Sequence, residues 1–237
     1  MSLSYIKISH FRTHELSVLK PTKEPIVIFG KNGVGKTNVL EAISMFAPGQ
    51  GFRRSKFSEL ARRPGSLGWK LVGQFQSLGS SFEVINYWNQ DSGRKILIDG
   101  KNASQSELAS LVRILWITPV MDRIWLNGSA ERRRFLDRIV SNLVPGHTEN
   151  SIKYYKALKQ RNKLIKEKIL DSNWYDALEK QMAVSGAEID KARSYVITYI
   201  MDMQKKSVSS FPFAELSIVG ERYLTPQTLE MALCKNR

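Results

Sequence analysis

The sequence is poor in cysteine: among its 237 residues, Cys234 is the only one. A single cysteine excludes a disulfide framework and a cysteine-based zinc site within one chain, and it suits a reducing cytosol. Long apolar runs are also missing. The first residues lack the apolar core of a signal peptide, and no later run approaches the length of a membrane-spanning helix. We therefore expect a cytoplasmic protein without a membrane anchor.

Acidic residues are scarce relative to basic ones. The chain holds 36 Lys and Arg against 22 Asp and Glu, which gives a formal net charge of +14 at pH 7 and a sequence pI near 9.9. This excess favours a polyanionic partner, nucleic acid before a membrane surface, with a basic surface kept for solubility as the alternative. Disorder is not expected, because 42% of the residues are hydrophobic and can form a core.

One glycine-rich stretch fits the phosphate-binding pattern G-x-x-x-x-G-K-[ST]. It consists of Gly30, Lys31, Asn32, Gly33, Val34, Gly35, Lys36 and Thr37. An apolar run at residues 26–29 precedes it and predicts a strand buried on both faces of a sheet, and apolar residues at helical spacing follow it. Strand, loop and helix in this order form the context in which the motif binds nucleotides, while a chance match in a glycine-rich turn is the alternative.

The spacing of the stretch explains its chemistry. Glycines let successive backbone N–H groups point at phosphate oxygens, and the N-terminus of the following helix favours an anion. In such a loop, Lys36 reaches the β- and γ-phosphates, and the Thr37 hydroxyl binds Mg²⁺. The stretch therefore predicts a site for a nucleotide phosphate chain with Mg²⁺.

Around this loop, the patterns predict an α/β fold whose first lobe covers residues 1–118. Alternation at Ile6 and Ile8 indicates a first strand, and three short alternating segments indicate an antiparallel meander within residues 69–98. A short helix and a buried strand at 114–117 complete the lobe. The aromatic residues of the meander are expected in the core rather than on a base-stacking surface; they are Trp69, Phe75, Phe82 and Trp88.

A helical lobe is expected over residues 119–210. Apolar stripes predict a helix at 130–144 and an antiparallel hairpin of two longer helices at 148–170 and 174–203. The remaining residues, 211–237, are expected to return to the first lobe through a short strand and a last helical turn or two.

Three groups of basic residues are candidates for contacts with nucleic-acid phosphates. They are Arg53, Arg54 and Lys56 in a loop, Arg132, Arg133 and Arg134 at the start of a helix, and Lys159, Arg161 and Lys163 in the hairpin. For each group, a solvated basic surface is the alternative. The arginine triplet opposes the helix dipole, and this small cost in stability favours a functional role.

Several of these motifs together resemble the RecF family of DNA replication and repair proteins. They are Phe11-Arg12, the stretch from Gly30 to Ile43, the stretch from Glu131 to Arg138, residues 158–162 and residues 174–176. The resemblance covers nearly the whole chain, and the loop combined with the arginine-rich helix is much more specific than the loop alone. It implies a phosphate-loop ATPase head of the ABC type with an inserted helical lobe, similar to the heads of chromosome-structure and double-strand-break repair proteins, with ATP and Mg²⁺ as cofactors.

The resemblance also implies partners and a pathway. The partners are single-stranded and gapped double-stranded DNA, RecO and RecR, and a second copy in an ATP-dependent homodimer. The pathway is recombinational gap repair, and the protein is expected to be required for a normal SOS response. Family members continue past residue 237 into a signature motif and a Walker B strand, so we expect a C-terminally truncated member with an incomplete head and little or no hydrolysis. One further departure is Val120, which stands where relatives carry a Gln and can neither donate nor accept a hydrogen bond.

Two other functions stay open at this point. One is a non-hydrolysing head fragment from a split or decaying reading frame, which would leave a sheet edge exposed. The other is a phosphate-loop phosphotransferase for a small molecule, against which the basic excess and the long helical hairpin argue.

Overall fold

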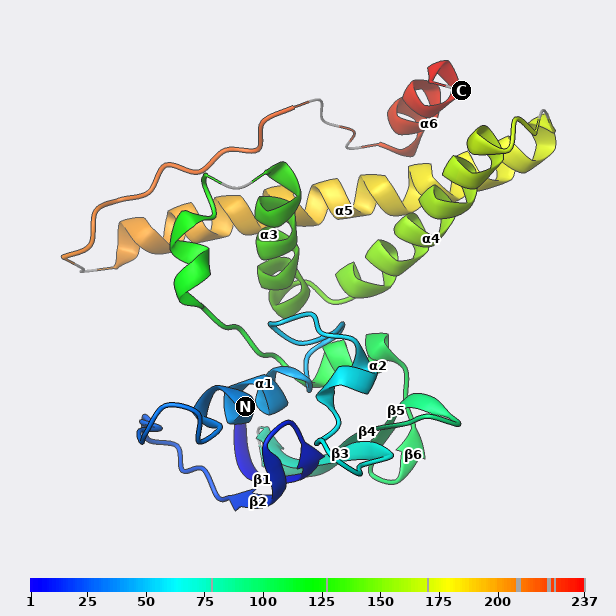
Figure 1. Ribbon diagram of the computed structural model, residues 1–237. Coiled ribbons are helices and arrows are strands. Elements are labelled where there is room, and N and C mark those ends of the chain that lie inside the picture. Colours follow the sequence, from blue (N-terminus) through cyan, green and yellow to red (C-terminus); the bar gives the residue numbers. More distant parts are fainter. Residues whose placement is uncertain are drawn as a thin grey trace. The chain divides into compact units, whose positions relative to one another are not determined.

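The computed structural model of the chain describes residues 1–77, 79–126, 128–169, 171–207, 210–220, 223 and 225–236. It divides into two compact units, Met1–Ile117 and Thr118–Arg237. Figure 1 shows the strands in the first unit and the long helices in the second. The division lies one residue from the boundary expected between the first lobe and the helical lobe.

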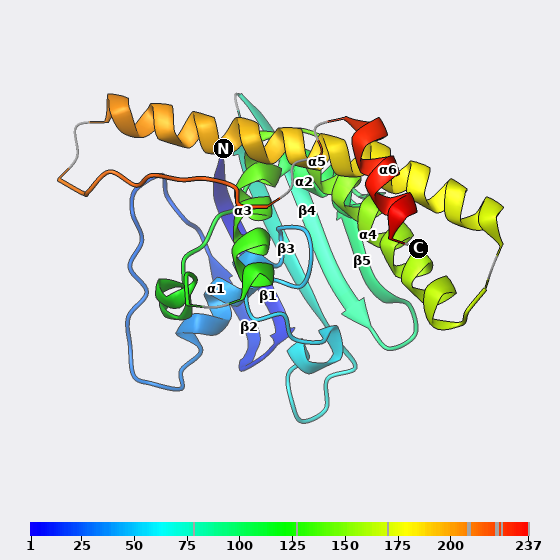
Figure 2. The ribbon, with the colours of Figure 1, turned by 90° about the horizontal axis from the view of Figure 1, so that it is seen from above.

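The first unit is built on one antiparallel sheet in the order β2-β1-β3-β4-β5-β6, and Figure 2 shows β1, β3, β4 and β5 side by side. Its strands are β1 (Ser2–Phe11), β2 (His14–Leu19), β3 (Gly68–Ser77), β4 (Ser80–Asn89), β5 (Gly93–Ile98) and β6 (Lys101–Asn102). These bounds confirm the predicted first strand and the three-stranded meander. Leu78, at the turn between β3 and β4, lies outside the described residues.

The core of this unit covers one face of the sheet. Alternate residues of β1 and β3 are buried there, because successive side chains of a strand point to opposite faces; they include Ile6, Ile8, Trp69, Leu71 and Phe75. Helix α1 (Lys36–Ser44) and the fully buried Phe46 cover this face together with α2 (Gln105–Leu111). A Cβ at Gly73 would lie 2.8 Å from the Phe46 ring, so the missing side chain makes room for it. The meander aromatics therefore belong to the core, as predicted.

Two predicted strands of this unit are not formed. Residues 26–29 and 114–117, all of them described, lie outside the six-stranded sheet and carry no strand assignment. Val27 is 80% and Phe29 is 88% exposed, instead of buried. A strand forms only where neighbouring strands take up its backbone hydrogen bonds, and an apolar sequence does not create those neighbours. The prediction of a strand buried on both faces is therefore wrong for this structure.

The second unit consists of helices. They are η2 (Pro119–Arg123), α3 (Ser129–Leu143), α4 (His147–Lys166), α5 (Ser172–Lys206) and α6 (Pro226–Lys235). The predicted helix at 130–144 and the helical hairpin are confirmed by α3 and by the pair α4 and α5. The Asp171 side chain begins α5 by accepting hydrogen bonds from the N–H groups of Asn173 and Trp174, which stabilises a helix N-terminus. Leu170, the predicted end of the first hairpin helix, lies outside the described residues.

The last part of the chain differs from the prediction. Residues 216–219, which are described, form no strand, and Val219 is 94% exposed. Residues 211–237 belong to the second unit, where α6 packs on α5, so the expected return to the first lobe is wrong. Arg237 itself lies outside the described residues. The apolar residues of 216–219 fit a strand by composition, but composition alone does not supply a neighbouring strand.

The contrast between two phenylalanines gives a test of this core. Phe46→Ala is expected to lower the free energy of unfolding by about 3–5 kcal/mol, because it opens a cavity in a packed core. Phe29→Ala is expected to change it by less than about 0.5 kcal/mol, because the ring is exposed. Urea unfolding of both variants measures the difference. A loss of several kcal/mol from Phe29→Ala would show that residues 26–29 are covered in solution.

Candidate functional site

The phosphate loop lies in the first unit and leads directly into α1. Gly30, Gly33 and Gly35 all have positive φ angles, 148°, 89° and 98°, which residues with a Cβ rarely adopt. Of the described side chains, none caps the N-terminus of α1, and the first turn of this helix contains no acidic residue. The first N–H groups of α1 and its positive dipole end are thus left for an anion.

The lysine of the motif contacts the backbone of its own loop. Lys36 Nζ donates to the carbonyl oxygens of Gly30 and Lys31, both at 2.7 Å, so the ammonium group folds back over the loop. Thr37, the next residue of α1, has an exposed side chain, as do Lys31, Asn32 and Val34 of the loop. The structure thereby brings the eight residues of the motif to one accessible junction of loop and helix.

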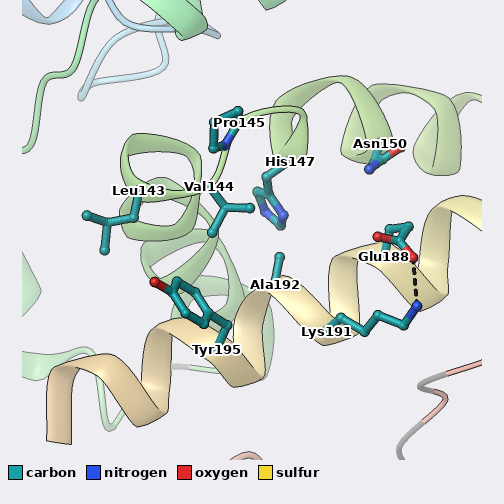
Figure 3. Close-up of a pocket in the computed structure, with 9 residues that line it drawn as sticks. All are labelled: Leu143, Val144, Pro145, His147, Asn150, Glu188, Lys191, Ala192 and Tyr195. Carbon is teal, nitrogen blue, oxygen red and sulfur yellow. Dashed lines mark hydrogen bonds and ion pairs between the residues drawn. The ribbon is translucent and has the colours of Figure 1, made fainter. Parts of the chain in front are cut away.

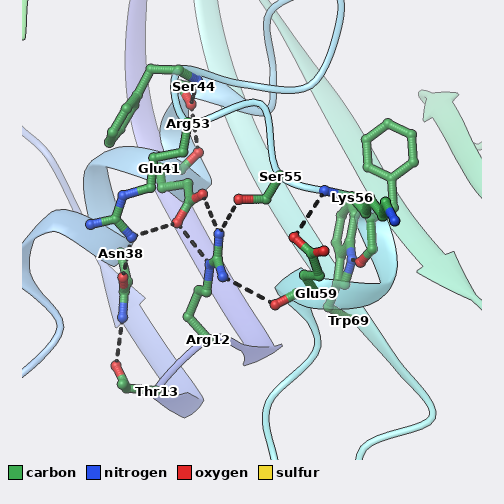
Figure 4. Close-up of polar contacts among 12 residues, drawn as sticks. Arg12, Thr13, Asn38, Glu41, Ser44, Arg53, Ser55, Lys56, Glu59 and Trp69 are labelled. Carbon is green, nitrogen blue, oxygen red and sulfur yellow. Dashed lines mark hydrogen bonds and ion pairs between the residues drawn. The ribbon is translucent and has the colours of Figure 1, made fainter.

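A buried carboxylate anchors the helix that follows the loop. Glu41 of α1 is fully buried and accepts hydrogen bonds from Arg12 Nε at 2.9 Å and from Arg12 Nη2 at 2.8 Å. Arg53 Nη1 donates to Glu41 Oε2, which also accepts from Arg12 Nε, and to Asn38 Oδ1, both at 3.0 Å (Figure 4). A buried charge persists only when it is paired in this way. Sequence reasoning missed Glu41, although an acidic residue within an apolar helix stripe is a usable signal.

The other basic candidates of the first two groups lie in the loop after α1 and at the start of α3. Arg54 and Lys56 are exposed in the loop after α1. At the start of α3, Arg133 donates to Ser129 Oγ at 3.1 Å and Arg134 pairs with Glu131 of the same helix. Arg132 Nη1 lies 3.4 Å from the Trp125 carbonyl oxygen. Arg133 and Arg134 are thus tied to the first turn of their own helix, Arg132 reaches a residue that precedes it, and Glu131 offsets part of the conflict of the triplet with the helix dipole.

The three residues of the third group differ in exposure. Lys159 and Lys163 are exposed on α4. Arg161 is buried, pairs with Glu179 of α5 at 2.9 Å, and donates to two carbonyl oxygens near the end of α6. Arg161 therefore joins three helices and is committed to the packing of the second unit.

A second candidate site is a cavity of about 420 Å³ between the α3–α4 turn and α5 (Figure 3). Its wall includes His147, whose Nε2 donates to Asp137 Oδ1 at 3.2 Å, and Asp137 also accepts two hydrogen bonds from Arg193. Burial is the largest influence and raises the pKa of Asp137, but the bonds and charges of His147 and Arg193 together outweigh it and hold this pKa below its ordinary value. This network fastens α3 and α4 to α5.

Two kinds of feature are absent from the described residues. Within the described ranges, no three His, Cys, Asp or Glu side chains are grouped so that they could hold a metal ion. Over the part of the chain that the structure describes, no helix is both long enough and apolar enough to cross a bilayer.

The glycine loop, the open start of α1 and the folded-back lysine define a phosphate-loop protein of the α/β class. A family model described as an AAA domain matches residues 5–192. This match covers most of the chain, and the chain belongs to the AAA domain family.

Curated relatives agree with the resemblance found in the motifs. The DNA replication and repair protein RecF of Mesorhizobium japonicum (strain LMG 29417 / CECT 9101 / MAFF 303099) is 33% identical over 225 residues. The aligned part covers 92% of this chain and 59% of that relative. The chain thus spans about three-fifths of the length of this relative, and the predicted resemblance to RecF is confirmed.

Solved structures confirm the fold. The structure of the recombination mediator protein RecF-ATP in the RecFOR pathway has a TM-score of 0.81 and 24% identity, covering 98% of this chain and 66% of that chain. The RecF-ATPrS structure of the same pathway has a TM-score of 0.77 and covers 86% of this chain and 56% of that one. The predicted α/β phosphate-loop head with a helical lobe is therefore correct as a fold class.

The ion pairs of Asp137 generate a prediction about pH. Because its pKa is lower in the folded chain than in the unfolded chain, the stabilisation is complete above the ordinary pKa and is lost as pH falls through the folded value. Asp137→Asn is therefore expected to destabilise the second unit at pH 6 and to differ less from the wild type at pH 3. Urea unfolding at both pH values tests this, with the exposed Glu188→Gln as control. An equal loss at both pH values would contradict it.

Proposed function

We propose that the chain binds ATP with Mg²⁺ at the phosphate loop and nucleic acid on its basic helical unit, as a RecF-type protein of DNA replication and recombinational gap repair. The observation that supports this most directly is the open N-terminus of α1 behind three positive-φ glycines, with Lys36 folded over the loop. The backbone N–H groups would hold the phosphates, Lys36 would neutralise them, and the Thr37 hydroxyl would bind Mg²⁺. Bound Mg²⁺ offsets phosphate charge.

The wider setting follows from the relatives named above. A curated relative named for DNA replication and repair and RecF structures named for ATP and the RecFOR pathway support a role at DNA. We include in the proposal single-stranded and gapped double-stranded DNA, RecO and RecR as partners, an ATP-dependent homodimer, a role in the SOS response, and a place in the cytoplasm. These relatives favour this function over a small-molecule phosphotransferase and over an inactive head fragment.

The nucleic-acid face that we propose is a lysine stripe on α4. Lys156, Lys159, Lys163 and Lys166 are exposed and three or four residues apart, which places them along one side of the helix. Lys163 pairs with Glu167 at 3.7 Å, but both side chains are largely exposed, so this pair is weak and leaves the lysine available. Arg161 is left out of the face because it is buried.

The nucleotide part of the proposal is tested by Lys36→Ala. Loss of charge-assisted hydrogen bonds worth roughly 1.5–3 kcal/mol is expected to weaken ATP binding at least about tenfold without unfolding the chain. Isothermal titration calorimetry measures the affinity, and Lys101→Ala, at an exposed lysine of β6, is the matched control. Unchanged affinity in Lys36→Ala would refute the site. Turnover measured in the same samples, with and without gapped DNA, is expected to be low.

The nucleic-acid part is tested by the double variant Lys159→Gln with Lys163→Gln. It is expected to weaken binding to a gapped duplex and to reduce the slope of log affinity against log salt by about 1–2, because two phosphate contacts are lost. Fluorescence anisotropy over a salt series measures both quantities. The matched control changes two exposed lysines of the first unit, Lys95 and Lys101, to Gln. An affinity that stays constant as salt rises would contradict the proposed face.

A further inference from the structure

The turn between β1 and β2 lies along the first two turns of α1 and contacts it residue by residue. The contacts pair Arg12 with Glu41, Thr13 with Asn38 and His14 with Gly35. Three consecutive residues, the last of which begins β2, thus meet Gly35 directly before α1 and two α1 residues three and six positions further on, and residues spaced by three lie along one face of a helix. Figure 4 shows the first two of these pairs. The turn acts as a clamp on the helix that starts at the phosphate loop.

The third contact of the clamp reaches the loop itself. His14 Nε2 lies 3.1 Å from the Gly35 carbonyl oxygen, and His14 Nδ1 lies 2.8 Å from Ser17 Oγ. A carbonyl oxygen only accepts hydrogen bonds, so Nε2 carries the proton and donates it. The Gly35 oxygen also accepts from the N–H groups of Asn38 at 2.9 Å and Val39 at 3.1 Å. This one oxygen therefore links the hairpin turn, the end of the loop and the first turn of α1.

The approach of the turn is so close that it requires the glycine. A Cβ at Gly35 would lie 2.5 Å from Thr13 Oγ1 and 2.7 Å from His14 Nε2, and the residue has a φ of +98°. The last glycine of the motif thus serves two purposes, since it allows the loop conformation and clears the space in which His14 reaches the carbonyl.

Because the peptide bond is planar, a contact with the Gly35 carbonyl also affects the orientation of the next N–H group. The Gly35 carbonyl and the Lys36 N–H belong to one trans peptide unit, in which they point in opposite directions. The hydrogen bond from His14 to this carbonyl, together with those from the Asn38 and Val39 N–H groups, therefore also constrains the direction of the Lys36 N–H. This N–H is one of the first donors of α1, which have no partner within the helix.

We propose that His14 is a positioning residue of the phosphate loop, which acts through the Gly35 carbonyl to aim the Lys36 N–H at a bound phosphate. The inference rests on the proposed binding of ATP at this loop, and it assigns His14 no contact with the nucleotide. The other two contacts of the clamp hold α1 against the turn. The affinity for ATP is therefore set in part by a side chain outside the glycine motif.

The test compares three variants by calorimetric titration with ATP. His14→Asn is too short to reach Gly35 and is expected to weaken binding about fivefold, the effect of one net hydrogen bond. His14→Gln can place an N–H donor at the same point and is expected to bind within about twofold of the wild type. His10→Asn, at an exposed histidine of β1, is the matched control and is expected to leave the affinity unchanged. Rescue by Gln separates positioning from a loss of packing.

A second measurement needs no nucleotide. Amide hydrogen exchange at Asn38 and Val39 is expected to be faster in His14→Asn than in the wild type and to return to the wild-type rate in His14→Gln, because both amides bond to the Gly35 oxygen. Equal ATP affinity and equal exchange in all variants would overturn the role of His14 while ATP binding stands. A wild-type chain that binds ATP no better than Lys36→Ala would instead overturn the proposed site and this inference with it.

Discussion

The architecture of the candidate nucleotide site depends on one buried carboxylate. Glu41 has no exposed surface, so its charge must be compensated within the protein, and Arg12 and Arg53 do this from two separate segments. One arginine comes from the β1–β2 turn and the other from the loop after α1. The requirement to pair this single charge therefore brings both segments onto the helix that begins at the phosphate loop. The pairing of a buried charge in this way is weak evidence for added stability, whereas removing one partner leaves an uncompensated buried charge and is costly.

The parts of the fold that could be predicted are those encoded over short distances. The meander, the hairpin of α4 and α5 and the phosphate loop each follow from alternation, helical periodicity or a local motif. The strands predicted at 26–29 and 114–117 are not formed, because a strand depends on neighbouring strands that are distant in sequence. The same reason applies to the site. The eight motif residues are local and were found, whereas Glu41 and His14 act through contacts with segments 20 to 30 residues away. The acidic residue within the apolar stripe of α1 marks Glu41 as unusual, but the sequence does not display its partners, and it gives no signal for His14.

Arginine and lysine have different uses in this chain. Arg12, Arg161 and Arg193 each form an ion pair with a largely buried carboxylate, those of Glu41, Glu179 and Asp137. The planar guanidinium suits such pairs, because it offers several donors in a fixed geometry and is less strongly hydrated than an ammonium group. The lysines of α4 remain in water. Net charge alone gives equal weight to both residue types, and for this reason Arg161 was indistinguishable from its neighbours in the sequence.

This division has a consequence for the kind of recognition that the lysine stripe can provide. Arg161, the one arginine of α4, is buried in its pair with Glu179, so the positive charge on the exposed surface of this helix comes from lysines. Flexible ammonium groups attract phosphates but do not read base edges, because contacts with phosphates set position and carry no sequence information. A preference for one DNA structure over another at this stripe must therefore come from the path of the phosphate backbone. The spacing of the lysines along a rigid helix is the feature that can distinguish such paths.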